Sequence, residues 1–131
     1  MKMRKLLTTI LILSAAATVL AADKVIRKQN NGTFVVNTST IAKDVRGYNG
    51  PTPLEIHIKD DRIVKIIILS NNETRNYFER VKKNLMSKWI GMKVNKVLST
   101  DIDAVTGATY TSDAVTENMK RALEYYKKNA K

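Results

Sequence analysis

The strongest constraint on the fold is an alternation of apolar and polar residues in the middle of the chain. Leu54, Ile56 and Ile58 alternate with polar residues, which predicts a β-strand with one buried and one solvent-facing side. A polar turn over residues 59–62 follows. The apolar run Ile63–Leu69 then predicts a second strand, of the kind that lies centrally in a sheet with both faces covered. The two strands predict an antiparallel hairpin.

Two helical patterns follow the hairpin. From Thr74 onward, apolar residues recur at four-residue spacing. The last part of the chain predicts a second helix, with Ser112 as its N-cap and Asp113 in its first turn, where the helix dipole favours a negative charge. The apolar stripe of this helix comprises Val115, Met119, Ala122, Leu123 and Tyr126. With a further strand predicted near Thr33–Val36, the fold class is α+β: a small antiparallel sheet packed with two helices.

The first 22 residues have the three-part layout of a secretory signal peptide. A basic start precedes an apolar run over residues 6–20, and Ala21 and Ala22 provide the cleavage site. We expect removal of residues 1–22, a polar tether over residues 23–31 and one domain over residues 32–131. The domain is then exported, to the periplasm or to the outer face of the cytoplasmic membrane. An uncleaved membrane anchor is the alternative, and it places the domain on the same side.

Composition excludes several kinds of chemistry. The 131 residues contain no cysteine, which excludes disulfides, thiolate catalysis and cysteine-ligated clusters, and the lone histidine predicts no metal site. The formal net charge is +11, and it falls to +8 if the leader is removed with its three basic residues. This balance indicates either a well-hydrated surface or an anionic partner. Nucleic acid is not expected, because the basic residues form no dense patch.

The segment Asp103–Ser112 places hydroxyl-bearing residues on a turn before the last predicted helix. Gly107 permits a turn that a Cβ would hinder, and Ala108 leaves room for a bulky group next to Thr109. The free N–H groups at the start of a helix suit a phosphate, and Tyr110 can lie against a flat ring. The segment therefore either caps the helix or carries a bound group on the Thr109 hydroxyl.

As a whole, the segment closely resembles the flavinylation motif of the FMN-binding domain family, which includes the C subunit of sodium-translocating NADH:quinone reductase and the G subunit of the Rnf complex. The motif is Asp, two variable residues, Ser or Thr, Gly, Ala or Ser, then Thr or Ser, and this chain matches every fixed position. Upstream, Gly47–Gly50 is similar to the family's glycine loop, and Glu73–Thr74 to its Glu-Thr pair. Many members continue that pair with Pro-Gly, whereas Arg75–Asn76 follows here, so the local loop is expected to differ. The resemblance covers about residues 32–127.

The resemblance implies that FMN is joined through its phosphate to Thr109, by a flavin transferase that uses FAD and Mg²⁺. It implies a role for Asp103 in transferase recognition or acceptor activation, and for Thr106 in hydrogen bonding to the phosphodiester. Gly107 and Ala108 would let the chain enter the transferase. The other residues expected at the cofactor site are Tyr110, Thr111, Ser112, Tyr48, Glu73 and Thr74.

The implied function is electron transfer between redox partners, among them a membrane electron-transport complex, with no catalytic residue supplied by the chain itself. Two other functions fit the residues. One is a module that binds flavin or a small anion without a covalent bond. The other is a non-redox binding protein in which the motif only caps the helix.

Overall fold

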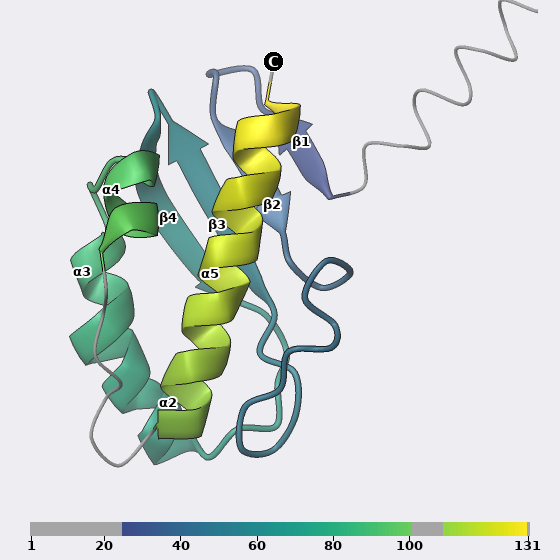
Figure 1. The fold of residues 1–131 in the computed structure, drawn as a ribbon, viewed down its shortest axis with the longest axis vertical. Helices are drawn as coiled ribbons and strands as arrows, with labels where there is room; N and C mark the ends of the chain where they lie inside the picture. Colours follow the sequence, from purple (N-terminus) through teal and green to yellow (C-terminus); the bar gives the residue numbers. More distant parts are fainter. Residues whose placement is uncertain (1–24, 101–108, 131) are drawn as a thin grey trace, which may run out of the picture.

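The structure, a computed structural model, describes residues 25–100 and 109–130. A four-stranded antiparallel sheet with helices packed against it confirms the predicted α+β class (Figure 1). The strands are β1 (Ile26–Lys28), β2 (Phe34–Asn37), β3 (Leu54–Lys59) and β4 (Arg62–Ile68), and they lie in the order β1-β2-β3-β4. The helices are α2 (Arg75–Val81), the π-helical η1 (Lys82–Met86), α3 (Ser87–Trp89), α4 (Val94–Ser99) and α5 (Thr109–Asn129).

The predicted hairpin is formed by β3 and β4. Leu54, Ile56 and Ile58 are fully buried, as their alternation predicts. Asp60 and Asp61 make the turn with positive φ angles of 51° and 61°, the conformation of a two-residue turn that follows the right-handed twist of the strands.

The prediction that Ile63–Leu69 forms a central strand is wrong, because β4 lies at the edge of the sheet. Within the described residues, the outer edge of β4 forms backbone hydrogen bonds only near the start of the strand. There, the Ile63 N–H donates to the Met92 carbonyl at 3.0 Å, and the Gly91 N–H donates to the Ile63 carbonyl at 2.7 Å. Beyond this point a helix, not another strand, lies beside β4. An apolar run shows that a strand is covered but not what covers it.

The segment predicted as a polar tether contains a strand. Residues 26–28 pair with β2, with Ile26 opposite Val36. Ile26 enters the core and the partly buried Val25 packs against it, but the exposed neighbours Arg27 and Lys28 conceal the strand pattern in the sequence.

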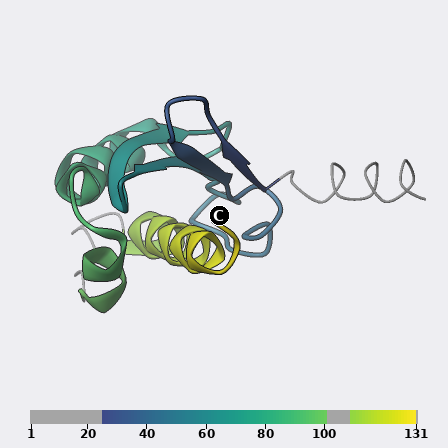
Figure 2. The same cartoon turned by 90° about the horizontal axis from the view of Figure 1, so that it is seen from above.

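The main core lies between the sheet and α5. Figures 1 and 2 show α5 crossing one face of the sheet, where it packs against β2 and β3. The predicted stripe residues Val115, Met119, Ala122 and Leu123 are buried, and the Tyr126 ring packs edge-on against Phe34 at 5.6 Å. On the other face of the sheet, His57 lies half-buried at 2.9 Å from Glu55.

The helix predicted from Thr74 runs without a break through α2, η1 and α3. Val81 and Leu85 are buried as expected, and Trp89 at its end is fully buried in the core. Val94 and Val97, whose local structure the pattern does not predict, lie on the short helix α4. Within the described residues, no helix combines the length and hydropathy needed to cross a membrane.

Helix α5 begins earlier than predicted. Ser112 is not the N-cap: it lies inside the helix, is buried, and donates a hydrogen bond from its hydroxyl to the Thr109 carbonyl at 3.0 Å. For the same reason Asp113 lies beyond the first turn. Within the described residues the helix therefore starts at Thr109, the residue predicted to accept the cofactor.

Candidate functional site

The carboxylate of Glu73 joins three segments that are far apart in the sequence. Its Oε1 accepts hydrogen bonds from the Tyr48 N–H at 2.7 Å and from the Thr111 hydroxyl at 2.9 Å. Its Oε2 accepts a bond from the Asn49 N–H at 2.5 Å. Hydrogen bonds to an ionised acceptor are stronger than neutral ones. One side chain thus fastens the glycine loop to the first turn of α5.

The position of Glu73 is set by the turn that precedes α2. Its N–H donates to the Asn71 side-chain oxygen at 3.0 Å, and the Asn71 amide donates to the Leu69 carbonyl at 3.1 Å. Thr74 then begins the helix as its N-cap residue, with its carbonyl accepting from the Phe78 N–H. The Arg75–Asn76 departure from the family pattern therefore falls in the first turn of α2, and Glu73 lies just before it.

The loop that Glu73 holds is a tight reversal between Arg46 and Pro51, closed by a 2.7 Å bond from the Gly47 N–H to the Gly50 carbonyl. Gly50 uses a positive φ of 138°, whereas Gly47 is required for space. A Cβ on Gly47 would lie 1.9 Å from the Glu73 Oε1. Glycine at this position lets the carboxylate reach the two N–H groups beyond it.

Two exposed tyrosines lie next to each other above this junction. The rings of Tyr48, from the loop, and Tyr110, from the first turn of α5, have centroids 6.1 Å apart and are tilted by 38°. They are 65% and 68% exposed, which is unusual for large rings in contact and leaves their faces accessible to a ligand. Thr109, directly before Tyr110, is also exposed and is the first residue of a 21-residue helix.

Buried polar contacts anchor the loop region to α5. The Thr38 hydroxyl donates to the Asn118 side-chain oxygen at 2.6 Å and accepts from the Leu54 N–H at 2.8 Å. The Asn118 amide donates to the Ala114 carbonyl at 2.9 Å and to the Thr52 hydroxyl at 3.3 Å. Because Thr38 and Thr52 lie on either side of the glycine loop in sequence, these bonds hold both of its ends against the helix.

A second anchor lies at the surface. Arg121 of α5 donates to both carboxylate oxygens of Asp44, at 2.6 and 3.1 Å, and to the Ile41 carbonyl at 3.1 Å. The hydrogen bond from Arg121 lowers the pKa of the Asp44 carboxyl, and the same contact raises the pKa of Arg121. The segment that leads into the glycine loop is thus fixed to the helix that carries Thr109.

The structure brings together most of the residues expected at the cofactor site: Tyr48, Glu73, Thr74, Thr109, Tyr110, Thr111 and Ser112. The remaining four, Asp103, Thr106, Gly107 and Ala108, lie outside the described residues. Asn49 belongs to the same site but is absent from the predicted set. Its N–H contacts Glu73, and its amide lies 3.4 Å from the Thr74 hydroxyl. Its place between two loop glycines is the signal that could have identified it.

This arrangement suits a ligand that combines a phosphate with a planar ring. The amino end of a long helix favours an anion, and the exposed tyrosine rings offer a surface for stacking. In the described part of the chain, no cluster of three or more acidic, histidine or cysteine side chains could hold a metal ion.

Comparison with known proteins identifies the same region. Residues 47–124 match the model of the FMN-binding domain. The chain is 32% identical over 112 residues to the G subunit of the ion-translocating oxidoreductase complex of Buchnera aphidicola subsp. Baizongia pistaciae, covering 74% of this chain and 50% of that one. It is also 26% identical over 118 residues to the NADH:acrylate oxidoreductase of Vibrio harveyi, covering 87% of this chain and 11% of that one.

The chain thus spans half or less of the length of these two relatives, so what is shared with them is a domain. The matched region begins at Gly47 and includes Glu73, both exposed tyrosines and Thr109. Because this region is more than half of the chain, the protein belongs to the FMN-binding domain family.

Proposed function

We propose that this protein is an exported electron carrier that holds FMN covalently, through a phosphoester on the hydroxyl of Thr109. The observation that carries the proposal is the position of Thr109. It is exposed, it is the first residue of α5, and it lies beside a pair of accessible aromatic rings that Glu73 holds in place. The sequence around it also matches the flavinylation motif at every fixed position.

The described residues fit each part of FMN. The start of α5 suits the phosphate, because the amino end of a long helix carries a partial positive charge. Tyr48 and Tyr110 would lie against the flavin ring system, and Glu73 would keep the loop that bears Tyr48 in place. When bound, FMN supplies one- and two-electron transfer, and the protein supplies its position and surroundings.

The loading reaction is a phosphoryl transfer without any change in oxidation state. The Thr109 oxygen forms a bond to the phosphorus on the riboflavin side of FAD, the pyrophosphate bond breaks, AMP leaves and the hydroxyl proton is released. A transferase with Mg²⁺ would catalyse this step. A covalent bond suits an exported protein, because free flavin is dilute outside the cell and a lost cofactor is not easily replaced.

The partners would be redox proteins. By its name, one relative is a subunit of an ion-translocating oxidoreductase complex, and the other is an NADH:acrylate oxidoreductase. Beside Thr109 the described surface is formed by the two exposed tyrosines and the glycine loop, which suits contact with another protein. We therefore propose electron exchange with protein partners, including a membrane complex on the outer side of the cytoplasmic membrane.

Intact-mass measurement tests the attachment. The protein is produced with an active flavin transferase and FAD, and the expected mass gain is one FMN less one water. Thr109→Ala should abolish the gain and Thr109→Ser should keep it, because the family motif accepts either hydroxyl. Thr111→Val, which removes the bond to Glu73 but keeps the acceptor, is the matched control and should still be loaded.

Other outcomes identify the other functions. Yellow colour that is lost on denaturation and filtration would indicate non-covalent binding. A colourless, unmodified protein in the presence of working transferase would falsify the covalent proposal. Export is tested on the same material from whole cells, since removal of residues 1–21 or 1–22 is visible in the mass.

A further inference from the structure

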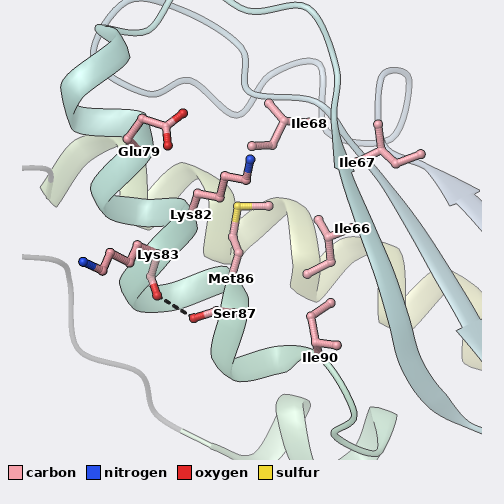
Figure 3. Close-up of a pocket in the computed structure, with 9 residues that line it drawn as sticks. All are labelled: Ile66, Ile67, Ile68, Glu79, Lys82, Lys83, Met86, Ser87 and Ile90. Atoms are coloured by element: carbon pink, nitrogen blue, oxygen red, sulfur yellow. Dashed lines mark hydrogen bonds between the residues drawn. The ribbon is translucent and has the colours of Figure 1, made fainter.

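A groove of about 740 Å³ lies along the outer side of β4 (Figure 3). One wall is the strand and the other is the continuous helix α2–η1–α3. The apolar side chains that line it are Ile66, Ile67, Ile68, Met86 and Ile90. In Figure 3, Ile66 and Ile68 point from the strand toward the helix, where Met86 lies. Ile90 is 46% exposed, so the apolar surface is open at one end.

The strand beside this groove offers unpaired backbone groups. Within the described residues, the outer edge of β4 is bonded only around Ile63, where the Gly91–Lys93 segment meets it. From Lys65 to Ile68 the strand is paired with β3 alone, and Val64 lies at an irregularity in the register without a partner in β3. An exposed edge of this kind is a template for an added strand, because its outward N–H and C=O groups lack protein partners.

The rim of the groove is positively charged. Lys82 and Lys83 line it and are exposed, and Figure 3 shows Lys82 extending from the helix toward the strand. Among the described residues that line the groove, Glu79 is the one acidic side chain. The same helix also bears the exposed basic residues Arg75, Arg80 and Lys88. An occupant of the groove should therefore carry negative charge.

We propose that this groove, bounded by β4 and the helix α2–η1–α3, is the docking site for an extended acidic segment of a partner protein. The segment would add to the free edge of β4, place alternate apolar side chains in the groove and pair its carboxylates with Lys82 and Lys83. That this partner exchanges electrons rests on the proposed function; the docking itself does not. Figure 1 shows α2 and the start of α5 at the same end of the molecule, so a docked partner would lie near Thr109.

Charge and geometry favour this occupant over the alternatives. A lipid surface could meet the lysines but could not pair with the backbone groups of a strand edge. A second copy of the chain would bring Lys65, Lys82 and Lys83 against like charges, in a protein of net charge +11. The chain's own first residues carry Lys2, Arg4 and Lys5, and they join the domain at β1, on the opposite edge of the sheet.

The test uses blocked eight-residue peptides in which leucine alternates with glutamate or, as a matched control, with lysine. Binding is followed by two-dimensional NMR of the isotope-labelled protein. The glutamate peptide should shift the amides of Val64–Ile68 and the methyl group of Met86, and the lysine peptide should not. The experiment is run on the FMN-loaded protein and on Thr109→Ala. Equal binding to both separates the docking from the flavin proposal.

A charge-reversal pair tests where the affinity arises. Lys82→Glu with Lys83→Glu should weaken peptide binding at least tenfold. Lys127→Glu with Lys128→Glu makes the same change of net charge at the far end of α5, on exposed residues, and should weaken it less than threefold. Ile90→Ser should also weaken binding, through the apolar part of the groove.

Four outcomes would overturn the proposal. The first is that the glutamate peptide shifts NMR signals only on other surfaces, and the second is that the two charge-reversal pairs lose equal peptide affinity. The third is that anionic phosphatidylglycerol vesicles perturb the β4 amides while the peptide does not. The fourth is a concentration-dependent dimer that buries β4.

Discussion

Replacing Gly47 with alanine should uncouple the glycine loop from α5. The added Cβ would lie 1.9 Å from the Glu73 Oε1 and 2.8 Å from its Cδ, well inside contact distance. The Glu73 side chain can swing away, but it then loses its bonds from the Tyr48 N–H, the Asn49 N–H and the Thr111 hydroxyl. Gly47 does not occupy the left-handed region, so the effect is steric rather than conformational.

The size of the effect follows from these three bonds. Hydrogen bonds to a charged group contribute about 1.5–3 kcal/mol each when buried, but this site is partly exposed and water replaces the lost partners. A net loss of about 2 kcal/mol is expected, which for a domain of this size lowers Tm by about 10 °C. Thermal unfolding followed by circular dichroism measures it.

A double-mutant cycle identifies the cause. Glu73→Ala removes the same three bonds and should cost about as much as Gly47→Ala. In the Glu73→Ala background the new Cβ meets mainly the Thr52 methyl group at 3.2 Å, so Gly47→Ala should cost less than about 0.5 kcal/mol there. Equal costs of Gly47→Ala in the two backgrounds would refute the reasoning.

Two further predictions concern the anchors of the loop. Asn118→Ala removes a fully buried amide, so the Thr38 and Thr52 hydroxyls lose a hydrogen-bond partner. It should lower the free energy of unfolding, measured by urea titration, by about 2–4 kcal/mol. An unchanged urea midpoint would contradict the role of this hydrogen-bond network. Asp44 has a lowered pKa because of Arg121, so its stabilising effect is present above the ordinary pKa of an aspartate and is lost as the pH falls through the lowered value. The Tm difference between wild type and Asp44→Asn, present at pH 7, should therefore begin to shrink at about pH 4, the ordinary pKa of an aspartate, and vanish only below the lowered pKa of Asp44, whereas a pH-independent difference would contradict the pairing.

The parts of the fold that are visible in the sequence are those with local periodicity. The alternation over Leu54–Lys59 and the stripe along α5 report burial directly, because side chains repeat every two residues in a strand and every 3.6 in a helix. The edge position of β4 and the existence of β1 depend on which segments lie beside them. A run of apolar residues carries no information about its neighbours, and Val25 and Ile26 are too few to make a pattern.

The candidate site likewise has a part that is visible in the sequence and a part that depends on tertiary contacts. The predicted acceptor Thr109 and its neighbours form one continuous motif in the sequence, whereas the bonds of Glu73 join it to residues 25 and 38 positions away along the chain. The early start of α5 is also a tertiary effect. The Thr111 hydroxyl donates to Glu73, and this contact helps to keep residues 109–111 helical. Local capping chemistry alone predicts a helix that begins only after Ser112.

The position of α5 after all four strands in the sequence couples the order of synthesis to the order of folding. The sheet that precedes it buries its apolar side only when α5 arrives, and the Thr38–Asn118 bond spans 80 residues. A nascent polypeptide that still lacks this last helix cannot close its interior, and ribosomes take several seconds to add twenty residues at their slower rates. Until α5 is made, the apolar side of the sheet therefore stays exposed to solvent.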